Sequence, residues 1–128
     1  MLPVLSAKRG LKDVTRRFLE ALSHSSFQGD IKADYPTRLI SATDNSVYQV
    51  MPQAVVYPKI AQDLNIVAEL GAREEFRGLS FAPRGGGTGT NGQSLNDGVV
   101  VDTSKYMNNI LSFDEEKRLV KVQPGVVL

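Results

Sequence analysis

Pro83-Arg84-Gly85-Gly86-Gly87-Thr88-Gly89-Thr90-Asn91-Gly92-Gln93-Ser94 is the stretch around which this chain is organised. Five glycines fall within the eight residues from Gly85 to Gly92. Ordering such a segment costs roughly 1–2 kcal/mol of backbone entropy per residue, so it is favoured where the backbone needs positive φ or must approach a ligand closely. Successive N–H groups without side chains can point into one concavity that suits an anion. Neighbouring threonines and Ser94 add short donors and Arg84 adds a positive charge, so the stretch predicts a phosphate or pyrophosphate site.

Several interpretations of this glycine loop compete. A P-loop is excluded, because Gly92 is followed by Gln93 rather than by Lys-Ser/Thr. The spacing Gly87-x-Gly89-x-x-Gly92 matches the dinucleotide fingerprint, but that fingerprint must open a helix. Here the next apolar run is 99–101, which is all valine and predicts a strand. The loop is therefore expected to join strand to strand. A flexible surface linker remains the alternative, and the two flanking apolar strands disfavour it.

Hydrophobic periodicity predicts alternating helices and strands along the rest of the chain. Helices are expected at 10–23, 36–41 and 59–76, strands at 54–57, 79–82 and 98–103, and a hairpin at 110–113 and 119–123 with the charged turn 114–117. Residues 1–10 are expected to be irregular and 25–34 to form a loop. The order strand, helix, strand over 54–82 predicts a right-handed βαβ unit with parallel strands. The glycine loop would then leave the carboxyl end of a strand, where α/β sheets usually bind ligands.

Polar residues outside the loop form three further candidates. A basic cluster near the N-terminus contains Lys8, Arg9, Lys12, Arg16 and Arg17. This cluster is interpreted as a solvated helix face, with contact to an anionic lipid surface or a partner as the alternative. His24 is the only histidine and is expected just past a helix end, not as a catalytic base. Asp44-Asn45-Ser46 is expected to form a turn through side-chain bonds to the backbone.

Composition limits the class of protein. The chain has 128 residues, enough for one domain that buries about two-thirds of its unfolded surface. The formal net charge of +1 gives no argument for nucleic-acid binding, and the absence of cysteine excludes disulfides, thiol nucleophiles and cysteine metal sites. No apolar run approaches the roughly 18–20 residues of a membrane span, and the apolar start is too short for a signal-peptide core. A cytoplasmic location is expected, at most peripheral to the inner face of the membrane.

The motif Pro-Arg-Gly-Gly-Gly-Thr-Gly-x-x-Gly-Gln between strands resembles the pyrophosphate loop of vanillyl-alcohol-oxidase or PCMH-type FAD-binding domains. It is most similar to the D-lactate and D-2-hydroxyacid dehydrogenase branch, and there to the D-2-hydroxyglutarate-type enzymes with an iron–sulfur module. Further segments share the resemblance: Asp44–Tyr48 followed by Pro52–Pro58, then Gly98–Ser104 and Val122–Val126.

This resemblance implies an α/β fold, the first subdomain of a PCMH-type FAD-binding domain, with a small mixed sheet, a βαβ unit and flanking helices. It places an N-terminal helical segment at 1–45 and the first subdomain at 46–128, truncated at its C-terminal end. The implied cofactor-binding residues are Arg84, Gly85, Gly86, Gly87, Thr88, Gly89, Thr90, Asn91, Gly92 and Gln93. The backbone amides and the Thr88 hydroxyl would be the donors. As an alternative to a purely structural role, the turn at 44–46 would lie near the flavin.

The resemblance also implies the chemistry of a longer protein. FAD would be non-covalent, because Thr88 stands where some relatives carry the histidine that attaches it. The substrate would be a small 2-hydroxy acid of D configuration, with hydride passing to the flavin and electrons going on to an unknown acceptor. Catalytic residues, the substrate cap and any iron–sulfur cluster would lie beyond residue 128, so the fragment alone is expected to be inactive.

Two other functions stay open at this point. The first is a stand-alone phosphate- or nucleotide-binding module without redox activity. The second is the FAD domain of another PCMH-type flavoenzyme, such as a cell-wall-precursor reductase or the flavin subunit of a molybdenum hydroxylase. Retention of a yellow chromophore would separate the redox proteins from the simple binding module.

Overall fold

A small mixed sheet forms the centre of the computed structural model, which describes residues 10–127. Its strands follow the order β1 (Asp30–Lys32), β2 (Ala54–Tyr57), β4 (Val99–Asp102), β3 (Phe81–Arg84). Strands β2, β4 and β3 are parallel, whereas β1 runs antiparallel to β2. The expected α/β class with a small mixed sheet is therefore confirmed. The expected irregular start at 1–10 lies almost entirely outside the described residues.

The βαβ unit has an inserted strand. Strands β2 and β3 are parallel and flank helix α3 (Ala61–Gly71) in the sequence, as expected. They are not neighbours, however, because the buried strand β4 lies between them. Since β3 and β4 are adjacent and parallel, the glycine loop must return from the carboxyl end of β3 to the amino end of β4. This return path over residues 85–98 is what gives the site its long, open loop.

Several element boundaries differ from the prediction. Strand β1 occupies part of the predicted loop 25–34, and pairs Ile31 with Val56 of β2. Helix α3 ends at Gly71, five residues before the predicted end at 76, and is followed by a short 3-10 turn at Glu74–Phe76. A Cβ on Gly71 would meet the Phe81 ring at 2.8 Å, so the helix end and β3 pack closely there. Strand β3 begins at Phe81, two residues later than predicted.

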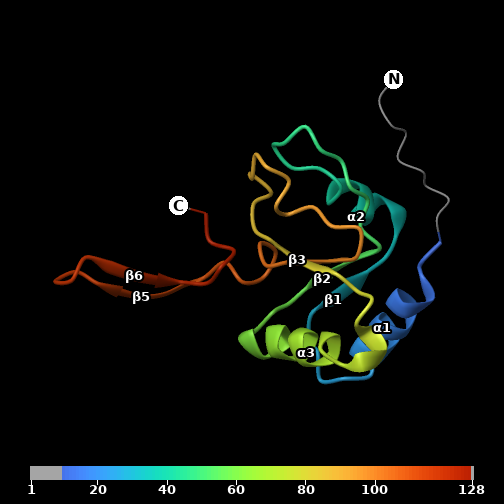
Figure 1. Cartoon of the computed structure of the whole chain (residues 1–128). Coiled ribbons are helices and arrows are strands. Elements are labelled where there is room, and N and C mark those ends of the chain that lie inside the picture. The colour runs from blue at the N-terminus through green and yellow to red at the C-terminus, as the bar shows by residue number, and fades with distance from the viewer. Residues whose placement is uncertain (1–9, 128) are drawn as a thin grey trace.

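Two helices cover one face of the sheet (Figure 1). Helix α1 (Asp13–Ser23) lies beside α3, and its Phe18 packs edge-on against Phe76 at 5.4 Å and Phe81 at 5.2 Å between ring centroids. Phe18 and Val56 of β2 belong to the same buried apolar cluster. The other face is covered by the short helix α2 (Tyr35–Ile40) and by the segments around 41–53 and 85–98. The helix-covered face supplies the core, and the other face carries the loops.

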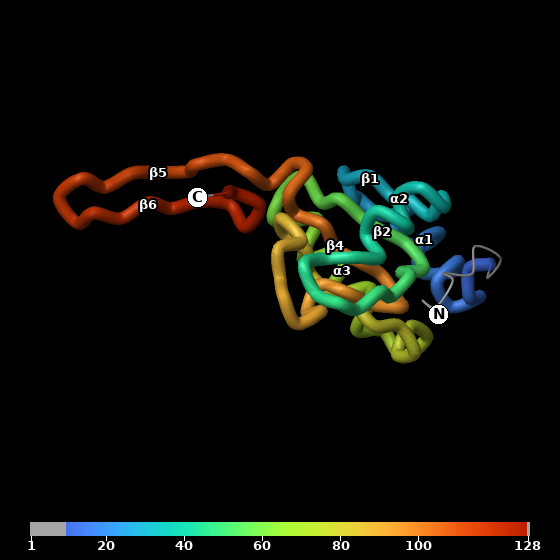
Figure 2. Tube along the Cα trace, turned by 90° about the horizontal axis from the view of Figure 1, so that it is seen from above, coloured from blue at the N-terminus to red at the C-terminus, as the bar shows by residue number. Residues whose placement is uncertain are grey.

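Strands β5 (Ile110–Asp114) and β6 (Leu119–Val122) form the predicted hairpin (Figure 2). The hairpin projects away from the body of the chain, and apolar side chains such as Phe113 and Leu119 are exposed on it. The predicted charged turn is confirmed: the backbone N–H of Lys117 donates to the Asp114 carboxylate at 2.9 Å.

A buried carboxylate fixes the start of α3. Asp63 is fully buried and accepts the backbone N–H of Gln28 and of Lys59, each at 2.8 Å, and that of Ile60 at 3.3 Å. Replacing Asp63 with alanine leaves these donors without a partner and is expected to lower the free energy of unfolding by about 2–4 kcal/mol. Urea denaturation measures this, with Glu69→Ala on the exposed side of α3 as control. Equal midpoints for the two variants would contradict the assigned role of Asp63.

A second carboxylate ties β1 to the turn after β4. Asp30 accepts the ammonium of Lys105 at 2.6 Å and the hydroxyl of Tyr106 at 2.7 Å. The hydrogen bond from Lys105, then that from Tyr106, lowers the pKa of Asp30 below its usual value. Lys105 also lies over the Tyr57 and Tyr106 rings, 5.0 and 4.9 Å from their centroids.

This depressed pKa gives the stability a definite dependence on pH. The contribution of Asp30 is fully present above the unfolded-state pKa of about 3.9 and is lost as the pH falls through the lower folded-state pKa. Asp30→Asn should therefore lower stability at neutral pH and flatten the loss of stability below about pH 4. Urea midpoints from neutral pH to about pH 2 measure this. Curves that stay parallel for wild type and variant would contradict it.

Candidate functional site

The glycine loop starts at the carboxyl edge of the sheet, as expected. The carbonyl of Arg84, the last residue of β3, accepts the backbone N–H of Thr103 at 2.9 Å. An ideal Cβ on Gly85 would lie 3.9 Å from the carbonyl oxygen of Pro124, so the turn before Gly125 borders the start of the loop. At the other end, the backbone N–H of Leu95 donates to the Gly92 carbonyl at 3.0 Å. The loop is thus fixed at both ends and open between them.

The middle of the loop presents unpaired backbone donors. Within residues 10–127, the N–H groups from Gly85 to Thr90 have no hydrogen-bond acceptor. Gly87 has φ 66° and Gly92 has φ 75°, which are left-handed conformations that side chains disfavour. The side chains of Thr88 and Thr90 are exposed. Free amides next to a left-handed glycine form the kind of concavity that accepts phosphate oxygens.

Two side chains of the loop fold back onto it. The Gln93 side-chain oxygen accepts the backbone N–H of Asn91 at 3.1 Å, and its amide group lies against Gly89. The Arg84 guanidinium donates to the Thr43 carbonyl at 2.8 Å and lies over Gly87. Both residues were expected in the site, and both help to shape the loop.

A second segment borders the loop. The backbone N–H of Asn45 donates to the Gly89 carbonyl at 3.1 Å, and the Tyr48 ring lies beside Gly92. Figure 1 shows this segment beside the glycine loop above the sheet. The expected turn is present, because the Asp44 carboxylate accepts the backbone N–H of Ser46 at 2.8 Å. Hydrogen bonds from Ser46, then from Ser94, together with the positive charge of Arg84, lower the pKa of Asp44. The sequence alone did not reveal that Thr43 and Asn45 contact the loop.

The other candidates lie away from this loop. His24 caps α1, with its Nδ1 2.8 Å from the Glu20 carbonyl oxygen. In the basic cluster, Arg16 and Arg17 both pair with Asp13, while Lys8 and Arg9 lie outside the described residues. Across 10–127 no cluster of side chains suited to a metal ion is found. None of the helices in that range is both long and apolar enough to cross a membrane.

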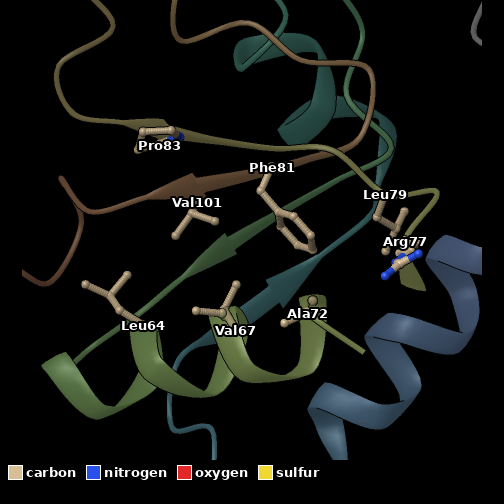
Figure 3. A pocket seen from close by; sticks show the side chains of 10 residues that line it. Leu64, Val67, Ala72, Arg77, Leu79, Phe81, Pro83 and Val101 are labelled. Carbon is tan, nitrogen blue, oxygen red and sulfur yellow. The ribbon is translucent and has the colours of Figure 1, made fainter. Parts of the chain in front are cut away.

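An apolar cavity of about 530 Å³ opens on the helix-covered side of the sheet (Figure 3). Leu64 and Val67 of α3 face Phe81, Pro83 and Val101 of the sheet across it. Arg77 is its one charged lining residue. Such a lining does not suit a pyrophosphate, so the glycine loop remains the candidate site.

Comparisons with known proteins identify the family of the chain. A family described as FAD binding domain matches residues 52–128. D-2-hydroxyglutarate dehydrogenase of Pseudomonas putida is 57% identical over 110 residues, which is 86% of this chain and 11% of that protein. The Escherichia coli K12 protein of the same name is 44% identical over 127 residues, or 99% of this chain and 12% of that protein. This chain therefore spans 11 to 12% of the length of these relatives.

The fold also has solved counterparts. The structure of an alkyldihydroxyacetonephosphate synthase superposes with a TM-score of 0.74 at 20% sequence identity. The match covers 91% of this chain and 24% of that chain. At this identity the likeness concerns the fold alone.

Proposed function

Because this chain belongs to the FAD-binding domain family, we propose that its loop Arg84–Gln93 binds the pyrophosphate of FAD. The observation that carries this assignment is the run of unpaired N–H groups from Gly85 to Thr90 at the carboxyl edge of β3. Backbone donors fixed in this way need no reorganisation when a phosphate oxygen arrives. The Thr88 hydroxyl adds a side-chain donor. Thr88 is the residue after the glycine triplet, and it has no imidazole ring for covalent attachment to the flavin.

We propose that the chain works as part of a longer enzyme, since it spans only 11 to 12% of its curated relatives. That enzyme would oxidise a D-2-hydroxy acid, as the names of the relatives state for those proteins. The flavin would supply the hydride acceptor. Residues 1–128 would hold the pyrophosphate and supply no catalytic acid or base, so this part of the enzyme would be inactive alone.

The division of the chain into a helical segment at 1–45 and a subdomain at 46–128 stays a prediction. A cytoplasmic location also stays a prediction, and cell fractionation would test it.

The experiment for this proposal uses the longer protein. FAD is titrated by flavin fluorescence and calorimetry, with FMN, ADP and inorganic pyrophosphate as comparison ligands. We expect saturable FAD binding, weaker ADP binding and still weaker FMN binding, because FMN has no pyrophosphate. Reduction of bound flavin by the D but not the L enantiomer of 2-hydroxyglutarate would support the proposed substrate class. A protein that binds no FAD would refute the proposed cofactor site, and binding without reduction by any 2-hydroxy acid would favour a different flavoenzyme or a binding module.

A further inference from the structure

The Arg84 side chain is turned toward protein groups. Its Nη2 donates to the Thr43 carbonyl at 2.8 Å, and its Nη1 lies 3.4 Å from the Ser94 hydroxyl oxygen. A Cβ on Gly87 would overlap the guanidinium, which shows that this group packs directly against the bend of the loop. The guanidinium therefore contacts the bend and the end of the loop, and a segment 41 residues earlier in the chain.

The contacts form a closed ring with segment 43–46. Ser94 is buried, and its hydroxyl lies 3.4 Å from the Asp44 carboxylate. The same carboxylate fixes Ser46, and the neighbouring Asn45 N–H holds the Gly89 carbonyl at 3.1 Å. The negative charge of Asp44 also offsets the positive charge of Arg84 close to the loop. A guanidinium that is half-buried, bonded and charge-compensated is poorly placed to attract a phosphate from solvent.

We propose that Arg84 is a positioning residue, which holds the glycine loop against segment 43–46 so that the backbone amides are ordered before FAD binds. This inference rests on the proposed function, since it assigns a role within the same site. It differs from the simpler expectation that Arg84 touches the pyrophosphate. In direct phosphate contact, loss of the Arg84 charge weakens the salt dependence of FAD affinity, whereas in a positioning role it leaves that salt dependence unchanged.

Arg84→Lys and Arg84→Ala together separate these roles, because lysine keeps the charge and loses the planar fork, whereas alanine loses both. We expect Arg84→Lys and Arg84→Ala each to weaken FAD binding to the longer protein by about tenfold. The salt dependence of FAD affinity should stay close to that of wild type in both, since no phosphate–guanidinium attraction is lost. An Arg84→Ala variant whose FAD affinity depends less on salt than that of Arg84→Lys would overturn the proposal in favour of direct phosphate contact, whatever the affinity of Arg84→Lys.

Asp44→Ala tests the acidic member of this ring of contacts. For this variant, the positioning role and a purely electrostatic effect predict opposite changes in FAD affinity. Removing a negative charge near the site should tighten the binding of an anionic ligand if charge alone acted. The positioning role instead predicts weaker FAD binding, because the turn at 44–46 is lost. A variant that binds FAD more tightly than wild type would overturn the proposal.

Amide hydrogen exchange of the FAD-free longer protein gives a readout that does not depend on the ligand. Both Arg84→Lys and Asp44→Ala should speed exchange in 43–48 and 89–95, while the strand β4 core keeps its wild-type protection. Unchanged exchange in these two segments would overturn the positioning role even if FAD affinity fell. Failure of the wild-type protein to bind FAD would instead refute the proposed function, so the two failures are distinguishable.

Discussion

Replacing Gly87 with valine is expected to weaken FAD binding by at least about 100-fold, which corresponds to about 2.7 kcal/mol. Gly87 has φ 66°, a conformation that costs an L-residue roughly 1–2 kcal/mol and is worse for a β-branched side chain. The new Cβ would also overlap the Arg84 guanidinium and displace it from the Thr43 carbonyl. The variant thus loses the bend that exposes the backbone amides. It also loses the contact between Arg84 and Thr43 that holds this bend in place. Calorimetric titration of FAD into the longer protein measures the change.

Gly87→Asn is the matched comparison for this prediction. Asparagine tolerates the left-handed region better than other residues with a Cβ, so it should retain more affinity than valine does. Gly78→Ala is the distant control, because a Cβ there meets no atom within 4 Å. Wild-type FAD affinity in Gly87→Val would show that the loop does not bind the pyrophosphate in the conformation described here.

Replacing Gly98 with alanine is expected to lower the free energy of unfolding by roughly 2–4 kcal/mol. A Cβ on Gly98 would overlap the carbonyl oxygen of Ser80, which is backbone and cannot rotate away as a side chain would. The Gly98 carbonyl accepts the N–H of Gln53 at 2.7 Å and that of Ala54 at 3.3 Å. A displaced Gly98 therefore disturbs the amino ends of β2, β4 and β3 together, at the point where the glycine loop rejoins the sheet.

Chemical denaturation of Gly98→Ala beside Gly78→Ala measures this effect with the same substitution at both positions. Gly78→Ala should leave the free energy of unfolding within about 0.5 kcal/mol of wild type. FAD affinity of Gly98→Ala should also fall, because the loop end moves with the strand. Identical midpoints for the two variants would show that the close approach of Gly98 to Ser80 is not maintained in solution.

Local signals predicted much of the fold. The apolar run 54–57 forms β2 with the expected bounds, and the strand-to-strand character of the glycine loop is confirmed. Strand β1 escaped prediction because it has three residues and only Ile31 is apolar. The place of β4 between β2 and β3 was also not predicted, because strand order depends on how the loops connect the strands.

The candidate site was also predictable only where a local sequence signal marks it. A glycine run between two strands favours a loop with free backbone donors, so Gly85–Gly92 could be identified as a candidate site from the sequence. The direction of the Arg84 side chain could not, because its acceptor is the backbone of Thr43, and any residue at that position would offer the same carbonyl. The Asp44-Asn45-Ser46 turn was visible as a turn, but its contact with Gly89 depends on the tertiary fold.

Amide hydrogen exchange of the longer protein, with and without FAD, shows whether the glycine loop binds the pyrophosphate. The amides from Gly85 to Thr90 have no acceptor within the described chain, so each one that bonds a phosphate oxygen should become protected when FAD binds. We expect slowed exchange in 85–93, with exchange in the hairpin turn 114–118 unchanged. Saturating FAD that leaves 85–93 exchanging freely while protecting other segments would contradict the assignment of this loop as the pyrophosphate site.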